Sequence, residues 1–403
     1  MTSPRRIVVV GAGAAGLTTL EALRRLGFDG ALALIGEEPH LPYDRPPLSK
    51  QILAGTWEPE RIALRGADAL AGLDADLLLG RRAAGLDMAA RQVLLDDGER
   101  IGFDGLVIAT GVNPRSLPGT DLAGIHLLRS LDDALSLRAR LLDGPTVAVV
   151  GAGFLGAEVA AVARGMGLDV TMIDPLPTPM YRQFGHRVGE LVGHLHADHG
   201  VSVRCGTGVN RFLGAAGHVV GVELTDGSTL KADLVVVAVG ASPAVEWLAG
   251  SGLPQGNGIE CDTRCRTAPG VYAAGDVARW HNGHFDTRMR LEHRMNATEQ
   301  AMAVAGNLLG ADKAFEPIPY FWSDQYDARI QAYGIFPENA DVTVLHGELA
   351  DRKFVVGYGR QGKTVGVLGW NSPRETRQLR QLVADHAPWP PQHSPLEATA
   401  ARP

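Results

Sequence analysis

The sequence predicts an α/β protein with two parallel-sheet domains and a smaller α+β domain at its C-terminal end. Branched apolar residues run without interruption at 7–10 and lead directly into a glycine-rich turn, and the same arrangement returns at 146–156. A continuous run of this kind indicates a strand that is buried on both faces, as in a parallel sheet. From Pro317 onward, aromatic residues and short alternating runs predominate, with one closing helix near 375–384. This last segment is therefore expected to be a separate α+β domain.

Each parallel-sheet domain begins with a complete βαβ unit. In the first, the predicted elements are a strand at 7–10, a turn at 11–16, a helix at 17–26 and a strand at 31–35, before Glu37. In the second, they are a strand at 146–150, a turn at 151–156, a helix at 157–165 and a strand at 169–173, before Asp174. This order predicts two Rossmann-like dinucleotide-binding domains.

The two turns share the spacing GxGxxG. Its glycines are Gly11, Gly13 and Gly16 in the first copy, and Gly151, Gly153 and Gly156 in the second. The first glycine permits a tight turn, the second lets the backbone approach a pyrophosphate, and the third lets the helix pack on the strand. The helix N-terminus then holds the phosphates through its free N–H groups and its dipole. The alternative is that these glycines serve only packing. That explanation would have to hold for both copies, and each copy is also followed by an acidic residue.

The acidic residues predict which nucleotide each domain takes. Glu37 and Asp174 stand where a carboxylate accepts hydrogen bonds from adenosine ribose hydroxyls, and where a 2′-phosphate would be repelled. No basic residue adjoins Asp174, so NADH is favoured over NADPH. Arg182 is near enough in sequence to reach a phosphate, although a solvated surface arginine is an equal alternative. Two nucleotide sites favour hydride transfer from NADH to a resident FAD, which we assign to the first domain.

Two further strand ends offer backbone that can approach a flavin. They are the segments 109–111 and 272–276, and Asp276 is expected to bind a ribityl hydroxyl unless it only closes a turn. The predicted domains are an FAD-binding domain at 1–112 and 245–318, an NAD-binding domain at 113–244, and a C-terminal domain at 319–403. The proline-rich end from His386 is expected to be a mobile tail.

Composition argues against several other classes of protein. The 403 residues include 38 basic and 45 acidic side chains, giving a net charge of -7 without a basic block, so nucleic-acid binding is not expected. No apolar run reaches the roughly 18 residues of a membrane span. Three cysteines without a CxxC pair favour a reducing cytoplasm. Cys261 and Cys265 are expected to fill the core, whereas His194, His196 and His199 are expected on a solvated helix face.

The longer motifs resemble those of bacterial NADH-dependent ferredoxin reductases, which serve cytochrome P-450 and Rieske dioxygenase systems. The resemblance rests on both glycine turns, on Leu41–Lys50 and Phe321–Tyr326, and on the strand ends at 109–111 and 272–276. It covers about residues 5–385 and implies a glutathione reductase-like arrangement of domains. It also implies a small acidic two-iron two-sulfur ferredoxin as the electron acceptor, and a monomer.

The resemblance further implies roles for individual residues. It gives Lys50 and Glu158 as the catalytic residues, with Lys50 beside the flavin and Glu158 near both the nicotinamide and Lys50. The alternative for Glu158 is an exposed first-turn helix acid. A positive charge at Lys50 favours the reduced flavin, and Trp322 borders the same ring. The other FAD contacts are Gly11, Gly13, Ala14, Ala15, Gly16, Glu37, Arg45, Ala83, Ala109, Thr110, Gly111, Arg129, Gly275, Asp276, His293 and Arg294. The NADH contacts are Gly151, Gly153, Phe154, Leu155, Gly156, Glu158, Asp174, Arg182 and Gly240.

The sequence departs from the family pattern at two positions. Arg294 stands where the family usually has tryptophan or a similarly bulky residue, and Thr178 replaces a base that commonly follows the ribose-binding acid. Residues 37–60 contain no cysteine, so no thiol there relays electrons from a flavin. Arg288, Arg290 and Arg294 are candidates for a ferredoxin landing surface, with structural salt bridges as the alternative. Rubredoxin reduction, direct NADH oxidation by oxygen and a non-catalytic NADH-responsive switch are the other functions considered.

Overall fold

The computed structural model describes residues 4–391, which divide into two compact units. The first unit contains Met1–Asp44, Glu60–Asn113 and Ser242–Pro319. The second contains Arg45–Pro59, Pro114–Ala241 and Tyr320–Pro403. Within the described residues, no helix is long and apolar enough to cross a membrane.

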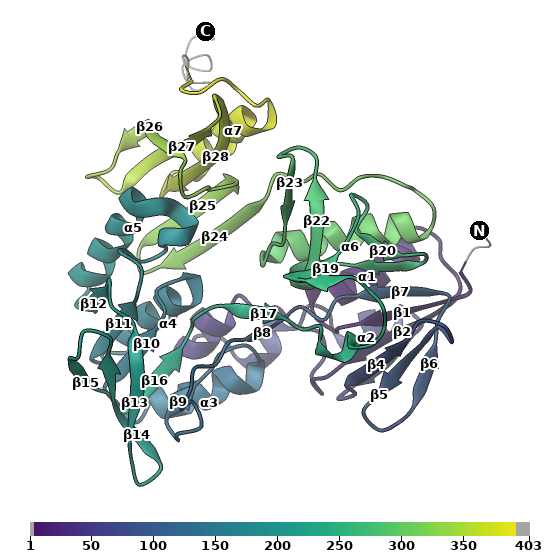
Figure 1. The fold of residues 1–403 in the computed structure, drawn as a ribbon, viewed down its shortest axis with the longest axis horizontal. Coiled ribbons are helices and arrows are strands. Elements are labelled where there is room, and N and C mark those ends of the chain that lie inside the picture. The colour runs from purple at the N-terminus through teal and green to yellow at the C-terminus, as the bar shows by residue number, and fades with distance from the viewer. Residues whose placement is uncertain (1–3, 392–403) are drawn as a thin grey trace. The chain divides into compact units, whose positions relative to one another are not determined.

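The first unit is built around a six-stranded sheet in the order β20-β21-β7-β1-β2-β3. Its strands β7, β1 and β2 lie side by side (Figure 1). Its elements are β1 Arg6–Val10, α1 Ala14–Arg25, β2 Ala31–Gly36, α2 Ala67–Ala71, β3 Ala75–Leu79, β4 Ala83–Asp87, β5 Gln92–Leu95, β6 Arg100–Gly102, β7 Gly105–Ile108, β18 Gln255–Gly256, β19 Gly258–Glu260, β20 Arg266–Ala268, β21 Val271–Ala273, β22 Ala278–Asn282, β23 Thr287–Met289 and α6 Arg294–Leu308. The strands β1, β2, β3, β7 and β21 run parallel, and α1 packs against α6.

The second unit contains a five-stranded parallel sheet in the order β12-β11-β10-β16-β9. The elements of this part are β9 Ile125–His126, α3 Leu131–Leu141, β10 Val147–Val150, α4 Phe154–Gly165, β11 Val170–Asp174, α5 Tyr181–Asp198, β12 Ser202–Cys205, β13 Val209–Ala215, β14 His218–Leu224, β15 Thr229–Lys231 and β16 Leu234–Val237. The short strands β8 Val112–Pro114 and β17 Ala241–Pro243 include two of the five points where the chain passes from one unit to the other.

A second sheet in this unit is antiparallel, in the order β24-β25-β28-β27-β26. Its strands are β24 Tyr320–Gln325, β25 Ala328–Gly334, β26 Asp341–Glu348, β27 Lys353–Arg360 and β28 Lys363–Trp370, followed by the helix α7 Pro373–Ala384. Apolar side chains of α7, among them Leu379 and Val383, are buried, and the helix packs on β28.

The predicted fold class is confirmed, because both parallel sheets and the C-terminal α+β segment are present. The central strands are apolar along their whole length since both of their faces are covered, as in the run from Ile7 to Val10, which is at most 3% exposed. The helices α1 and α4 begin three residues earlier than predicted, because each starts directly after the second glycine of its turn. The three-domain division stays a prediction.

The expected tail is partly held in place. The backbone N–H of Thr364 donates to the carbonyl of Ala387, and that of Trp389 donates to the carbonyl of Gly362. The indole of Trp389 covers Gly359, where a Cβ would collide with its ring. The ordered chain therefore continues beyond His386, and the rest of the predicted tail, 392–403, lies outside the described residues.

Candidate functional site

The first glycine turn joins β1 to α1. Gly11 has a φ of +114°, and a Cβ there would collide with the carbonyl oxygen of Ala109. At Gly16 a Cβ would collide with the carbonyl oxygen of Gly11. Gly13 is different, because nothing lies within 4 Å of the position that its Cβ would take. The first and third glycines are therefore required by the chain itself, whereas the second leaves an open space beside the turn.

The second turn, between β10 and α4, repeats this geometry. Gly151 has a φ of +102° and lies against the carbonyl oxygen of Ala238, and Gly156 lies against that of Gly151. At Gly153 only the amide of Gln183 comes within 4 Å of a Cβ position, at 3.7 Å. Two segments 140 positions apart thus share the same division of roles among their glycines.

Both turns fit the pyrophosphate of a dinucleotide. Each helix has glycine as its N-cap, no side chain that caps its N–H groups, and no acidic residue in its first turn. The first N–H groups of α1 and α4 are therefore available to an anion, and the helix dipole adds a positive potential. The open side of Gly13 and of Gly153 lets such a group approach the backbone.

The two predicted ribose-binding acids differ in their surroundings. Asp174 ends β11, and its carboxylate accepts from the backbone N–H of Ala152 at 2.7 Å and from that of Leu176 at 2.8 Å. It is thereby fixed against the second glycine turn. Glu37 follows β2 and is exposed, with Arg82 Nε 3.5 Å from its carboxylate. Each acid stands at the strand end where the sequence predicts it.

Thr178, which stands where the family commonly has a base, is turned into the protein. Its side chain is buried, and its Oγ1 lies against the backbone of α5 where Gly189 leaves room for it. Among the described residues this hydroxyl has no hydrogen-bond partner. The position therefore faces the protein, whereas Arg182 at the start of α5 is exposed.

Lys50 lies on a π-helical turn, Leu48–Ile52. This turn is part of Arg45–Pro59, a segment that belongs to the second unit. Such turns are rare, and they occur frequently at functional sites. Leu48, Ile52 and Leu53 are at most 3% exposed and anchor the turn, which packs against α3 and α4. The ammonium of Lys50 donates to the carbonyl of Pro46 at 3.1 Å and to Glu158 Oε2 at 2.7 Å.

Glu158 is the centre of a buried polar cluster. It is the fifth residue of α4, is 6% exposed, and is surrounded in the helix by buried alanine and valine. Ser49 donates to Oε2 at 2.6 Å, and Ser323 donates to Oε1 at 2.7 Å. Together with Lys50 these donors satisfy a carboxylate that would otherwise be costly to bury. The alternative of an exposed first-turn acid is therefore wrong.

The strand β24 supplies residues that the sequence analysis missed. Phe321, Ser323 and Gln325 alternate along it and are buried, whereas Trp322 is half-buried on the opposite face and stacks on Tyr320 at 5.9 Å. Gln325 bonds to His196 Nε2 at 2.9 Å. The expectation that His196 is solvated is wrong, because it is fully buried, whereas His194 and His199 are exposed as expected.

The other predicted FAD residues of the first unit lie mainly around α1 and α6. Gly275 has a φ of +77° and approaches Ala15, and its N–H donates to Gln300 at 2.9 Å. Asp276 follows it, and His293 and Arg294 begin α6. Desolvation lowers the pKa of His293 to about 4. Ala83 is buried at the start of β4, and Thr110 donates to the carbonyl of Ala244 at 2.8 Å.

In addition to Lys50 and Trp322, two predicted FAD residues belong to the second unit. Arg45 and Arg129 lie in that unit, and Arg45 Nη1 is 3.5 Å from the carbonyl oxygen of Arg129. Among the predicted NADH residues, Phe154 packs edge-on against Phe184 and Phe321. Gly240 has a φ of +92° and is exposed.

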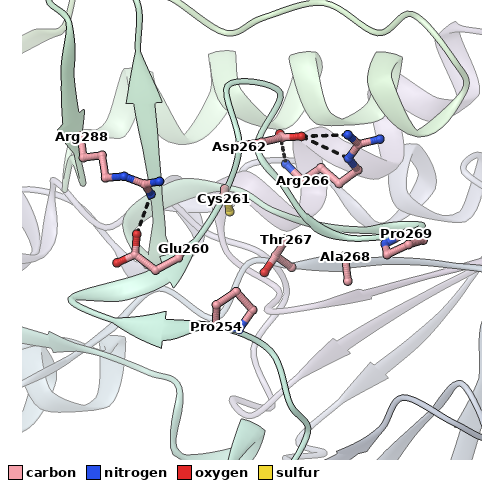
Figure 2. Close-up of a pocket in the computed structure, with 9 residues that line it drawn as sticks. All are labelled: Pro254, Glu260, Cys261, Asp262, Arg266, Thr267, Ala268, Pro269 and Arg288. Atoms are coloured by element: carbon pink, nitrogen blue, oxygen red, sulfur yellow. Dashed lines mark hydrogen bonds and ion pairs between the residues drawn. The ribbon is translucent and has the colours of Figure 1, made fainter.

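The three arginines considered as a landing surface all carry ion pairs. Arg288 pairs with Glu260 at 2.8 Å, Arg290 with Glu292 at 2.7 Å, and Arg294 with Asp44. Figure 2 shows Arg288 and Arg266 turned toward Glu260 and Asp262 at an open pocket of about 660 Å³. Each of these guanidinium groups thus has a carboxylate partner, and Glu260 also pairs with Arg279, which favours the structural alternative for this cluster.

None of the three cysteines is poised to react. All are unpaired, and Cys261 and Cys265 are buried as expected. Burial raises the pKa of Cys265 to about 12, and burial together with the nearby Asp174 raises that of Cys205 to about 12. Burial is also the main reason that the pKa of the Cys261 thiol is raised.

Comparisons with known proteins agree with this arrangement. Residues 5–301 match the pyridine nucleotide-disulphide oxidoreductase family, and residues 320–398 match the reductase C-terminal family. Rhodocoxin reductase of Rhodococcus erythropolis is 36% identical over 391 residues, which covers 96% of this chain and 91% of that protein. The ferredoxin–NAD(+) reductase component of the anthranilate 1,2-dioxygenase system of Burkholderia cepacia is 40% identical over 389 residues, which covers 96% and 95%.

A solved structure of similar fold is that of the covalent putidaredoxin reductase–putidaredoxin complex. It matches with a TM-score of 0.91 and 34% identity, covering 96% of this chain and 94% of the other. The resemblance to bacterial ferredoxin reductases is thereby confirmed over nearly the whole chain. This chain belongs to the pyridine nucleotide-disulphide oxidoreductase family, and its C-terminal segment belongs to the reductase C-terminal family.

Proposed function

We propose that this protein is an NADH-dependent ferredoxin reductase that feeds a cytochrome P-450 or a Rieske dioxygenase through a two-iron two-sulfur ferredoxin. The observation that carries this proposal is the pair of uncapped glycine turns, each at a strand–helix junction with an acidic residue at the next strand end. Relatives of nearly equal length bear names of this function. One solved relative is a complex with putidaredoxin, which supports a small redox protein as the partner.

The residues of the first unit fit FAD. The N-terminus of α1 would hold the pyrophosphate beside Gly13, Glu37 would accept from the ribose, and the segment at Gly275 and Asp276 would contact the ribityl chain. FAD, when bound, accepts two electrons as a hydride from NADH and passes them singly to a one-electron carrier. One NADH and two oxidised ferredoxins thereby give NAD⁺, two reduced ferredoxins and one proton.

The residues of the second unit fit NADH. The turn at Gly153 would hold its pyrophosphate, and Asp174 would accept from the ribose hydroxyls with the lone pairs that its two backbone N–H contacts leave free. We assign Lys50 a positive charge beside the flavin, and Glu158 the task of holding Lys50 in place and bordering the nicotinamide. No acid or base is needed for the hydride itself.

The test is an anaerobic rapid-mixing experiment. We expect the purified protein to show flavin absorption that bleaches quickly with NADH and much more slowly with NADPH, and to reduce an added two-iron two-sulfur ferredoxin in turnover. A colourless protein, or a yellow protein indifferent to both nucleotides, would refute the proposal. Turnover with oxygen alone would favour an NADH oxidase, turnover with rubredoxin alone a rubredoxin reductase, and bleaching without turnover an NADH-responsive switch.

The nucleotide preference has its own test. Asp174→Asn keeps the shape of the side chain but removes its charge and half of its acceptor capacity, so we expect the KM for NADH to rise about tenfold with little change in kcat. An unchanged KM would show that Asp174 only closes the turn. Location in the cytoplasm and the monomeric state remain predictions.

A further inference from the structure

A continuous chain of hydrogen-bonded side chains leads away from Glu158 within the second unit. Ser323 Oγ is 2.7 Å from Glu158 Oε1, Gln325 Nε2 is 3.1 Å from Ser323 Oγ, and His196 Nε2 is 2.9 Å from Gln325 Oε1. The hydroxyl of Tyr326 lies 3.4 Å from His196 Nδ1 at the outer end. Glu158, His196, Ser323 and Gln325 are at most 6% exposed, so water does not compete for these contacts.

The chemistry of the groups fixes the direction of every bond in this chain. An amide oxygen only accepts, so His196 Nε2 carries the proton that it donates to Gln325. The neutral imidazole then has a bare Nδ1, which accepts from Tyr326. The amide nitrogen of Gln325 only donates, so the Ser323 hydroxyl accepts from it and has its own proton left for Glu158. All donors therefore point toward one carboxylate.

The groups around His196 keep it in the neutral form that this direction requires. Its pKa is lowered to about 4, chiefly by burial; the bond to Gln325 opposes this effect, and the neighbouring His199 adds to it. His199 stacks on Tyr326 at 3.8 Å, and burial raises the pKa of Tyr326 to about 12 against the effect of Arg164. The outer donor thus stays protonated.

We propose that Gln325 and His196 are positioning residues that hold the Ser323 hydroxyl as a donor to Glu158 and so fix the carboxylate toward Lys50. Their task rests on the proposed function, in which Lys50 and Glu158 border the reacting rings. Aligned dipoles in a buried chain polarise one another, so each link strengthens the bonds nearer to Glu158. Gln325 is required because an amide both accepts from His196 and donates to Ser323, whereas a carboxylate at the same place only accepts.

The first test determines the direction of the hydrogen bonds from the protonation of the His196 ring, and it needs no catalytic turnover. In the holoenzyme labelled with ¹⁵N-histidine, we expect the His196 ring at neutral pH to show a protonated Nε2 and an unprotonated Nδ1, assigned by loss of the signal in His196→Gln. A proton on Nδ1, or on both nitrogens, would overturn the inference. This measurement stands even if the protein proves not to oxidise NADH, so the two proposals fail separately.

The second test compares variants of matched shape by the rate of flavin bleaching with NADH. Gln325→Glu turns the Ser323 hydroxyl away from Glu158, and we expect the rate to fall about tenfold. His196→Leu removes the outer donor and should lower the rate about threefold. His196→Gln supplies an amide N–H in place of the Nε2–H and an amide oxygen in place of the Nδ1 acceptor, and should keep most of the rate. His194→Gln on the exposed side of α5 is the control for the helix.

Equal rates in His196→Leu and His196→Gln would refute the positioning role, as would an unchanged rate in Gln325→Glu. If Gln325→Glu does not fold, the two His196 variants still decide the matter, because a loss that follows packing alone would not be reversed by glutamine.

Discussion

Lys50 and Glu158 lie 108 positions apart in the sequence, yet Nζ of the lysine is 2.7 Å from Oε2 of the glutamate. The lysine side chain is 14% exposed and that of the glutamate 7%. The pair is thus mostly withdrawn from water, and it joins the π-helical turn at Leu48–Ile52 to α4. Removal of this ion pair should lower the stability of the second unit as well as the rate of turnover.

Lys50→Gln is expected to lower the free energy of unfolding of the second unit by about 2 kcal/mol, because a buried carboxylate loses its charged donor. The double variant Lys50→Gln/Glu158→Gln should be more stable than the sum of the single changes predicts. Denaturant unfolding followed in all four proteins gives the coupling between the two residues. The same cycle on the exposed pair Arg140–Asp143 is the control, and it should give well under 1 kcal/mol. Equal couplings in the two cycles would contradict this account.

Local patterns were sufficient to predict the sheets and both glycine turns. A parallel strand is apolar on both faces, and the glycines are required by backbone atoms a few residues away or on the adjacent strand. Short segments of the sequence are therefore enough to predict these features. Burial of Glu158 was also open to prediction, because α4 carries alanine and valine on all its sides. Only the resemblance suggested its pairing with Lys50.

The polar chain behind Glu158 was not predicted, because its links join distant segments. Gln325 and His196 are separated by 129 positions, and the pattern of neither segment indicates the other as its partner. A signal for His196 was nevertheless present, since it follows Val188 and Val192 at four-residue spacing on the buried side of α5. Ser323 and Gln325 likewise share the buried face of a strand on which only Trp322 was singled out.

The second glycine of each turn gives a test in which folding and cofactor binding separate. Gly13 has a φ of −85° and Gly153 a φ of −75°, which alanine adopts, and the space beside both is open. We expect Gly13→Ala to fold but to lose most of its flavin absorption, because the Cβ occupies the approach to the phosphates. Gly153→Ala should keep the flavin and raise the KM for NADH about tenfold or more.

Two controls frame this prediction. Gly66→Ala places a Cβ in open space at the N-cap of α2, away from the turn, and should change neither property. Gly16→Ala collides with the carbonyl oxygen of Gly11 and should fold poorly. Flavin content measured by absorbance, together with the thermal midpoint, distinguishes these cases. Full flavin content in Gly13→Ala would remove the turn from the binding site.

The three thiols should be inert in the folded protein. With pKa values raised to about 12 at Cys205 and Cys265, the thiolate fraction at pH 8 is on the order of one in ten thousand. A thiol-specific chromogenic reagent is expected to react slowly with the native protein and rapidly after denaturation, and NADH-dependent bleaching should survive the treatment. Rapid labelling of the native protein with parallel loss of bleaching would indicate a redox thiol.

Acidification tests the burial of His196. Its pKa falls from the ordinary 6.5 to about 4 on folding because of desolvation. Between these values the unfolded chain binds a proton that the native protein excludes, so the contribution of His196 is complete above pH 6.5 and is lost as the pH falls toward 4. Across this window His196 lowers the free energy of unfolding by about 1.4 kcal/mol for each pH unit of acidification. His196→Gln should lose stability less steeply than the wild type over this window, whereas exposed His194→Gln should follow the wild type. Parallel pH profiles of the thermal midpoint for His196→Gln and the wild type would show that the imidazole takes up its proton equally well in the folded state, where its Nδ1 would then no longer accept from Tyr326.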